Sequence, residues 1–212
     1  DFAFTEDVLI GTEAPYISDY KKTLRKITLP STLKEIGNCA FARCPIEEIV
    51  IPNTVISIGI GAFAQCHEAS GTLIIPGSLK TIKMWSFWDC KKLTELTIKE
   101  GVQSIEKRAF SGCQGFKGDL IIPNSVESLG EAAFVLCDGF DGKLVVGSGI
   151  RKMDRNVFSL CNGFINLILK DGITVIGEGA FGYGFTGTLT IPNSVTSIGK
   201  GAFSGCYGFT GS

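Results

Sequence analysis

The chain has 212 residues, of which 44% are hydrophobic and 19% are charged, and its formal net charge is −1. Such a composition is apolar enough to bury a core, which excludes bulk disorder. A charge so close to zero argues against nucleic acid or an anionic membrane as the main partner, because both attract a basic surplus. No apolar run approaches the roughly 20 residues of a membrane-spanning helix, so we expect no membrane span in this chain.

Residues 1–20 differ from the rest of the sequence. They begin Asp1-Phe2-Ala3-Phe4, without the basic stretch and apolar run of a secretory signal peptide. The pair Ala3-Phe4 matches the start of a motif that recurs further on, so we interpret this segment as an atypical N-terminal segment or the remnant of a preceding repeat. Residues 21–212 are predicted to form one repeat domain.

A repeat of 22–24 residues fills that domain, and each copy contains a phenylalanine that is preceded by alanine in six of eight cases. Three residues after the phenylalanine comes a cysteine in seven copies and Gly184 in the remaining one. So regular a spacing is the signature of a repeat architecture. The eight phenylalanines are Phe41, Phe63, Phe87, Phe110, Phe134, Phe158, Phe181 and Phe203.

Each repeat contains a short run that alternates apolar and other residues, as in Leu120-Ile121-Ile122-Pro123. This period of two predicts a strand, and the proline that often follows ends it, because proline lacks the N–H for the next ladder bond. An Asn/Ser turn comes next, then a second apolar pair such as Val126 and Leu129, and then the Ala-Phe-x-x-Cys segment, for which we expect a single helical turn.

One such coil cannot bury its apolar edge alone, whereas stacked coils form a continuous core. The predicted fold is therefore a leucine-rich-repeat-like right-handed solenoid of about eight coils. We expect one long parallel β-sheet on one face, with short strands and single helical turns elsewhere. The length variation falls mostly just after the cysteine, at Gly-Phe-x-Gly runs such as 115–118 and 139–142, so these runs should share one corner.

The pattern Cys-x-x-Leu-x-x-Ile-x-Ile-Pro, followed by Val-x-x-Ile-Gly-x-x-Ala-Phe, resembles the BspA-type leucine-rich repeat family. The clearest matches run over residues 120–137 and 189–206, and the resemblance covers about residues 21–212. It implies a surface-exposed or secreted protein of a host-associated bacterium or protist, and a role in adhesion to host or bacterial proteins. It brings no catalytic residues with it, and a shared fold does not determine a ligand.

In each strand, the residue between two inward apolar positions should point outward, as should the residue two positions earlier. The first row is β-branched and the second is mostly polar or charged, which is the pattern of a protein-binding face. The same residues also suit any sheet surface, so both interpretations stay open. The candidate partner-binding face comprises Lys26, Thr28, Glu48, Val50, Ile74, Glu95, Thr97, Asp119, Ile121, Lys143, Val145, Ile168 and Thr190. Exposed aromatic residues could add anchors, namely Tyr16, Tyr20, Trp85, Trp88 and Tyr207.

Other motifs have structural explanations. One cysteine per coil forms a line, whereas a metal-thiolate site needs clustered ligands, so we interpret the cysteines as packed core thiols. Cys39 lies outside that line, and a local disulfide with Cys44 stays open. The run from Gly177 to Gly182 matches G-x-G-x-x-G, but the same glycines recur at each repeat corner, and a dinucleotide site needs a following helix.

The only histidine, His67, cannot supply a multi-histidine metal site, and no nucleophile–base arrangement is evident. We therefore expect no catalytic, cofactor or metal site. The leading hypothesis is a non-enzymatic cell-surface or secreted module that holds a protein or peptide on the sheet face. The alternatives are a structural spacer that presents another domain and, more remotely, an enzyme. Because the last residues, 206–211, lead up to a strand, we expect either that the chain is part of a longer array, which we favour, or that something outside it caps this end.

Overall fold

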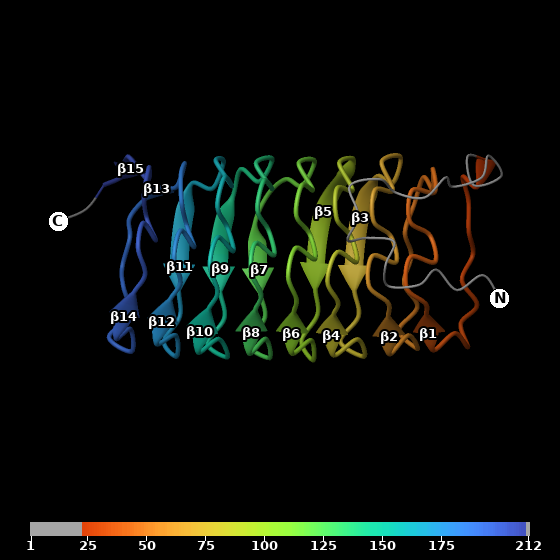
Figure 1. Cartoon of the computed structure of the whole chain (residues 1–212), viewed down its shortest axis with the longest axis horizontal. Helices are drawn as coiled ribbons and strands as arrows, with labels where there is room; N and C mark the ends of the chain where they lie inside the picture. Colours follow the sequence, from red (N-terminus) through yellow and green to blue (C-terminus); the bar gives the residue numbers. More distant parts are fainter. Residues whose placement is uncertain (1–22, 211–212) are drawn as a thin grey trace.

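The computed structural model describes residues 23–210, which form a parallel β-solenoid of about eight coils with almost no helix (Figure 1). Every strand pairing is parallel and joins one coil to the next. The predicted solenoid is confirmed. The strands are β1 (Glu35–Ile36), β2 (Ser57–Ile58), β3 (Gly71–Ile75), β4 (Thr81–Ile82), β5 (Leu93–Ile98), β6 (Ser104–Ile105), β7 (Leu120–Ile122), β8 (Ser128–Leu129), β9 (Lys143–Val146), β10 (Lys152–Met153), β11 (Asn166–Leu169), β12 (Val175–Ile176), β13 (Thr186–Gly187), β14 (Ser197–Ile198) and β15 (Gly208–Phe209).

The longer strands lie on one face, but the expected single long sheet is wrong. That face carries a two-stranded sheet, β3–β5, and a three-stranded sheet, β7–β9–β11. The more continuous sheet lies elsewhere on the coil and is built from two-residue strands: β4, β6, β8, β10, β12 and β14 pair in succession, and β1 pairs with β2. The division of the long-strand face follows the prolines.

Wherever two long strands pair, the residue just beyond the second strand carries an N–H. Lys99 N donates to Ile75 O at 3.0 Å across β3–β5, and Lys170 N donates to Val146 O at 3.1 Å across β9–β11. Gly147 holds the same position after β9, which pairs with β7. In a parallel ladder the slanted bonds run in both directions between neighbouring strands, and this N–H supplies one of them at β3–β5 and at β9–β11.

Wherever the pairing is missing, the equivalent residue is a proline. The ring nitrogen has no hydrogen, so the carbonyl of the preceding coil has no donor at that point. Proline therefore does more than end its own strand: it also uncouples that strand from the preceding coil. The four prolines at these breaks are Pro52, Pro76, Pro123 and Pro192.

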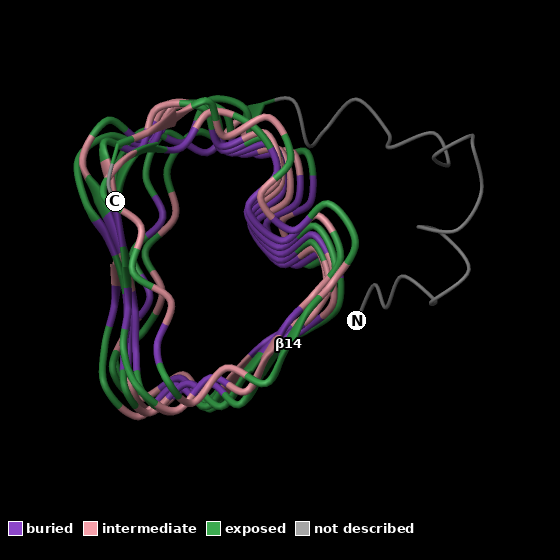
Figure 2. Ribbon diagram, turned by 90° about the vertical axis from the view of Figure 1, so that its left-hand side faces the viewer, coloured by how far each residue is buried: buried purple, intermediate pink, exposed green. Residues whose placement is uncertain are grey.

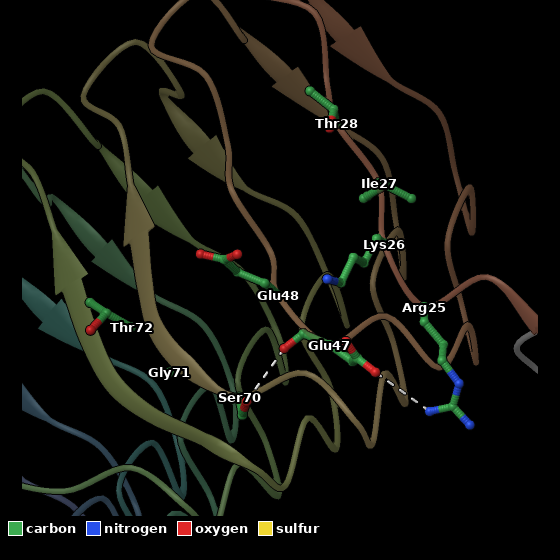
Figure 3. Close-up of a pocket in the computed structure, with 9 residues that line it drawn as sticks. All are labelled: Arg25, Lys26, Ile27, Thr28, Glu47, Glu48, Ser70, Gly71 and Thr72. Carbon is green, nitrogen blue, oxygen red and sulfur yellow. Dashed lines mark hydrogen bonds and ion pairs between the residues drawn. The ribbon is translucent and has the colours of Figure 1, made fainter.

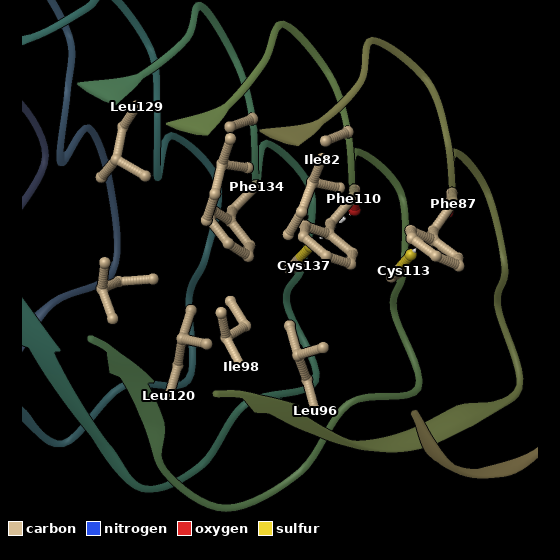
Figure 4. Close-up of a cluster of buried hydrophobic side chains, with 14 of the residues drawn as sticks. Ile82, Phe87, Leu96, Ile98, Phe110, Cys113, Leu120, Leu129, Phe134 and Cys137 are labelled. Carbon is tan, nitrogen blue, oxygen red and sulfur yellow. Dashed lines mark hydrogen bonds between the residues drawn. The ribbon is translucent and has the colours of Figure 1, made fainter. Parts of the chain in front are cut away.

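The repeat phenylalanines form one continuous stack through the core. Successive ring centroids lie 5.1–5.7 Å apart, with interplanar angles of 17° or less. From Phe63 to Phe181 the side chains are fully buried. Figure 2 shows buried segments on the inner side of the coil, and Figure 4 shows part of the stack against the strand leucines and isoleucines. Stacked rings and aliphatic side chains together make one core along the solenoid.

A second stack occupies the Gly-Phe-x-Gly corner, which the sequence indicated only as a site of length variation. Phe116, Phe140, Phe164 and Phe185 are all buried, and their successive centroids lie 5.0–5.5 Å apart. The longer corners thus add aromatic core, and they add no exposed loop at these phenylalanines.

The glycine before each of these phenylalanines lets the coils approach closely. A Cβ at Gly139 would lie 2.0 Å from Gln114 O and 2.7 Å from Phe116 O. Both atoms belong to the backbone of the preceding coil, so neither can move without opening the stack. Gly115 and Gly163 meet carbonyl oxygens of their preceding coils in the same way.

We therefore expect Gly139→Ala to destabilise the protein by more than about 2 kcal/mol, because the overlap must separate two coils of a close-packed core. Gly37→Ala is the matched control: nothing lies within 4 Å of the position that its new Cβ would take, so it should change stability by less than about 0.5 kcal/mol. Urea unfolding followed by circular dichroism measures both. Equal effects of the two substitutions would contradict the close-approach explanation.

The expected helical turn at Ala-Phe-x-x-Cys is wrong. Around Phe63, turn bonds within the coil alternate with bonds to the next coil: Ala64 N donates to Gly61 O at 3.0 Å, whereas Phe63 N donates to Ser86 O at 2.8 Å. The residues two before and two after each phenylalanine have a positive φ in all eight coils, including Leu136 at 61°. A helix would keep all of its backbone hydrogen bonds within one coil, whereas in this segment alternate N–H groups donate to the neighbouring coil.

Candidate functional site

All thirteen residues of the candidate partner-binding face lie within the described part of the chain. Eleven are exposed, and Thr97 and Val145 are half-buried. Strand register places Ile74 beside Thr97, and Ile121 beside Val145, which in turn lies beside Ile168. The structure thus sets these outward side chains side by side, as the alternation in each strand predicted.

The apolar row on this face is strongly exposed for aliphatic side chains. The exposed fractions are 60% for Val50, 47% for Ile74, 57% for Ile121 and 39% for Ile168. β-Branched residues suit a sheet surface, but burying them against a partner would also release apolar area from water. Covering the row with an apolar partner would therefore make a favourable contribution to the free energy of binding.

The charged border has a partly structural role. Glu95 Oε2 accepts a hydrogen bond from Thr72 Oγ1 at 2.8 Å, and Asp119 Oδ1 accepts one from Lys143 N at 2.7 Å. One oxygen of each carboxylate therefore links two coils. Lys26 and Glu48 form no hydrogen bond or ion pair with any residue between 23 and 210, so their charges are available to a partner.

A groove of about 550 Å³ opens at the N-terminal end of this face (Figure 3). Three successive coils line it, with residues 25–28 on one wall, Glu47 and Glu48 between, and residues 70–72 on the other wall. Arg25 and Glu47 form an exposed ion pair at 3.6 Å. The groove brings together Lys26, Thr28 and Glu48 of the candidate face.

Corner length explains why the groove lies there. Five positions separate Cys44 from Ile49, whereas seven separate Cys66 from Leu73 in the next coil. The middle coil thus reaches its strand position by a shorter path than the coil that follows. Sequence reasoning missed Arg25, Glu47, Ser70 and Thr72 as groove residues, although this difference in spacing was the available signal.

The cysteines are bound within the core. From Cys66 onward, each thiol of the regular ladder donates to the carbonyl of the repeat phenylalanine in the preceding coil, as Cys113 Sγ does to Phe87 O at 3.1 Å (Figure 4). The same contact recurs in six coils, at 2.9–3.1 Å. A thiol is a small apolar group that also carries a weak hydrogen-bond donor. This donor explains why the position holds cysteine, since alanine could fill it but could not donate.

Burial also makes Cys113, Cys137 and Cys161 poor nucleophiles. Loss of solvation raises the pKa of Cys113 and of Cys161 to about 12, and it raises the pKa of Cys137 as well. The reactive form is the thiolate, which is scarce at neutral pH under these conditions. No disulfide joins Cys39 and Cys44, so the bridge left open by the sequence is absent.

The remaining sequence motifs have structural explanations. Nε2 of the exposed His67 lies 2.9 Å from Asp89 Oδ2. Cys66 Sγ donates to Phe41 O, so Cys66 and His67, although adjacent in sequence, do not form a catalytic pair. Residues 177–182 form a repeat corner with no helix after them. Among residues 23–210, no three His, Cys, Asp or Glu side chains are grouped so as to hold a metal ion.

The candidate aromatic anchors differ in accessibility. Tyr207 is 95% exposed, whereas Trp85 and Trp88 are half-buried, and Trp88 packs against Cys39, Ala42 and Ala64. Tyr16 and Tyr20 lie outside the described residues, as does the atypical segment 1–20. Trp85, Trp88 and Tyr207 do not belong to the apolar row of the sheet face.

Solved structures similar to this chain are leucine-rich repeat proteins of bacteria. A leucine-rich repeat protein of T. pallidum superposes with a TM-score of 0.68 at 23% identity, covering 90% of this chain and 79% of that one. A leucine-rich cell surface protein of Faecalibacterium prausnitzii gives a TM-score of 0.56 at 27% identity, covering 88% of this chain and 45% of that one. A leucine-rich repeat protein of Eubacterium ventriosum gives 0.51 at 21% identity, covering 85% and 64%.

No curated protein matches the sequence significantly. Within the described residues, no helix has the length and apolar character needed to cross a membrane. The family model of the BspA-type leucine-rich repeat region matches residues 16–141 and 93–210, with six copies of the repeat. The matched segments span most of the chain and coincide with the observed coils, so the protein belongs to the BspA-type leucine-rich repeat family.

Proposed function

We propose that this protein is a non-enzymatic binding module of a bacterial cell surface or secreted protein, and that it holds a protein or peptide partner on the long-strand face. The observation that carries this proposal is the row of exposed aliphatic side chains along that face. The family supports it, and so does the similarity to the leucine-rich cell surface protein of Faecalibacterium.

Both the rigidity and the composition of the long-strand face suit it to binding. Strand pairing between β7, β9 and β11 fixes Ile121, Val145 and Ile168 at the spacing of adjacent strands, about 4.8 Å. Little side-chain entropy is lost when such residues are covered, because β-branched side chains are already restricted. Polar and charged residues border the row, so a partner would meet an apolar centre with a polar rim.

The test introduces charge into the row. Peptides that bind the whole chain are first selected from a phage-displayed random library, and their affinities are measured by fluorescence anisotropy. We expect the double substitution Ile121→Lys and Ile168→Lys to weaken binding at least about tenfold, because two lysines would be desolvated in the interface. The thermal unfolding midpoint should stay close to that of the wild type, since both side chains are exposed.

The control places the same change on a different surface. Ile56 and Ile198 are 54% and 51% exposed and lie on the short-strand side of their coils. Ile56→Lys together with Ile198→Lys should leave the affinities unchanged. If both double variants bind like the wild type, the sheet face is not the binding surface.

A spacer role is the second candidate, because similar proteins are longer than the matched region. This chain spans 45% of the Faecalibacterium protein and 64% of the Eubacterium protein. A spacer needs stability but no exposed apolar row. Wild-type affinity in the Ile121/Ile168 variant, together with wild-type stability, would therefore favour the spacer.

A further inference from the structure

The residue two positions after each repeat phenylalanine changes character along the solenoid. The eight repeat phenylalanines number the coils, and in coils 1–3 this residue is polar. Arg43 Nε donates to Gln65 Oε1 at 2.7 Å within the polar part of the row. In coils 5–7 the same position holds Leu136, Leu160 and Tyr183. The repeat therefore tolerates polar side chains here, and the fold does not require apolar ones.

These three apolar side chains occupy an unfavourable backbone conformation. Their φ angles are 61°, 61° and 70°, in the left-handed region that a Cβ atom disfavours. Glycine, which has no such cost, holds the position in coils 4 and 8, at Gly112 and Gly205. Leu136 and Tyr183 are also 43% and 52% exposed. Backbone strain and exposed apolar area coincide, and both point to a binding role.

The apolar side chains form a continuous surface over coils 5–8. This surface, called the leucine–tyrosine patch, comprises Leu136, Leu160, Tyr183 and Tyr207. Backbone bonds join its coils, as Leu160 N does by donating to Gly182 O at 2.9 Å. The Tyr183 ring reaches over coil 8, where a Cβ at Gly205 would overlap it. Tyr207 follows in coil 8 and is 95% exposed.

A row of alternating charges runs beside the patch, at the position three residues before each repeat phenylalanine. From coil 4 to coil 8 the row reads Lys107, Glu131, Arg155, Glu178 and Lys200. Glu131 is paired with both neighbours, at 3.2 Å from Lys107 Nζ and 2.9 Å from Arg155 Nη2. The side chains of Glu178 and Lys200 form no ion pair or hydrogen bond with any residue between 23 and 210. Two opposite charges are therefore available to a partner.

This charge row is complementary to itself when its direction is reversed. A two-fold axis that crosses the solenoid between coils 6 and 7 places coil 5 opposite coil 8, and coil 6 opposite coil 7. Lys200 then faces Glu131 of a second copy, and Glu178 faces Arg155. An axis through coil 6 would instead set Glu131 against Glu178. An axis between coils 5 and 6 would leave Lys200 opposite Met84, so only the first arrangement gives both available charges an opposite one.

The same axis covers the leucine–tyrosine patch. Leu160 faces Tyr183 of the second copy, and Leu136 faces Gly205, over which the Tyr183 ring lies. Apolar area on both copies would leave water, with the charge row along its border. An apolar centre with a charged rim is the usual composition of a protein interface.

We propose that the leucine–tyrosine patch is the interface of a symmetric dimer of this chain. The patch covers four coils at about 4.8 Å each, which is small for an interface, so we expect a dissociation constant on the order of 10–100 µM. The patch shares no residue with the long-strand face, so each dimer carries two such faces. If these faces bind a partner as proposed above, the dimer gains avidity for a surface that displays several partner copies; the dimer itself does not rest on that function.

The first test is sedimentation velocity on the whole chain, from about 2 to 500 µM so as to bracket this constant. Leu160→Gly should weaken dimerisation at least about tenfold, whereas its thermal unfolding midpoint should be unchanged or higher because glycine relieves the positive φ. Gln65→Gly is the matched control: it changes the same position, at φ 57°, in a polar coil. It should affect stability in the same direction and leave the dimer intact.

Three outcomes of this measurement would overturn the proposal. The wild type could remain a monomer at the highest concentration. It could form species that grow beyond the dimer, which a closed two-fold contact does not allow. Leu160→Gly could dimerise like the wild type.

The second test identifies the contact by charge exchange between chains. Arg155→Glu alone sets two glutamates against each other, and Glu178→Arg alone sets two arginines against each other, so neither variant should dimerise. In an equimolar mixture, the new glutamate of one chain faces the new arginine of the other, and the unchanged Arg155 and Glu178 form the second contact. Dimers should therefore return in the mixture. A mixture that stays monomeric would overturn the two-fold arrangement.

A last control separates this interface from the long-strand face. The Ile121→Lys and Ile168→Lys double variant should dimerise like the wild type, whatever its affinity for peptides. Loss of the dimer in that variant, with a normal dimer in Leu160→Gly, would place self-association on the long-strand face and overturn the proposal.

Discussion

Replacing Phe110 by alanine should lower the free energy of unfolding by about 3–5 kcal/mol, the range for large buried aromatic side chains. Phe110 is fully buried, and its ring stacks on Phe87 at 5.4 Å and on Phe134 at 5.1 Å. It also meets Phe116 of the second stack edge-on at 6.4 Å. The substitution removes contacts to both neighbouring coils and leaves a cavity in the middle of the array.

The stability of a solenoid is approximately a sum of terms within coils and between adjacent coils. Loss of two adjacent interfaces should therefore also reduce the cooperativity of unfolding, seen as a lower slope in urea denaturation. Phe203→Ala is the control. Phe203 is half-buried and stacks only on Phe181 along the same row, so its loss should cost less than half as much. A change below about 1 kcal/mol for Phe110→Ala would show that the stack contributes little.

The second large effect is a loss of stability in alkaline solution. Burial raises the pKa of Cys113 and Cys161 from 9.0 to about 12 in the folded chain. In the unfolded chain the same thiols ionise near their ordinary pKa. Between these two values the folded state keeps protons that the unfolded state has lost, so stability falls as pH rises. The stability contributed by the protonated thiols is fully present below about pH 9.

The size of this effect follows from linkage. A difference of three pKa units corresponds to a loss on the order of 4 kcal/mol for each of these two thiols by about pH 12, and Cys137 adds to it. Because a domain of this kind is typically stable by about 5–15 kcal/mol, we expect unfolding before pH 12. Urea titrations at a series of pH values from 8 to 11 measure how steeply the free energy of unfolding falls with pH.

Lysine and tyrosine side chains titrate in the same range, so a thiol-free comparison is needed. The triple substitution of Cys113, Cys137 and Cys161 by alanine should be less stable at pH 8, because three S–H donors are lost. Its stability should nevertheless fall more slowly between pH 9 and 11 than that of the wild type. Parallel slopes for the two proteins would show that the buried thiols do not cause the alkaline loss.

Much of the candidate site was predictable because it depends on local periodicity. Alternation within a strand decides which side chains face outward, so the exposure of Val50, Ile121 and Ile168 followed from the sequence. The groove was not predictable in the same way. It depends on how two neighbouring coils of unequal corner length lie together, so its only signal was the difference in spacing, and the residue types at Glu47 and Ser70 gave none.

The repeat, the coil length and the residues of the core could all be derived from the sequence. These follow from the spacing of phenylalanine, cysteine and strand residues, because stacking identical units buries identical positions. The sequence also contained the reason for the broken sheet, since proline lacks an N–H wherever it occurs. Where that missing donor matters depends on how the coils stack, because the carbonyl left without a partner belongs to the preceding coil. The stacking of coils also decided that the Ala-Phe-x-x-Cys segment gives up helical bonds for bonds between coils, since the competing partner lies more than 20 residues away in sequence.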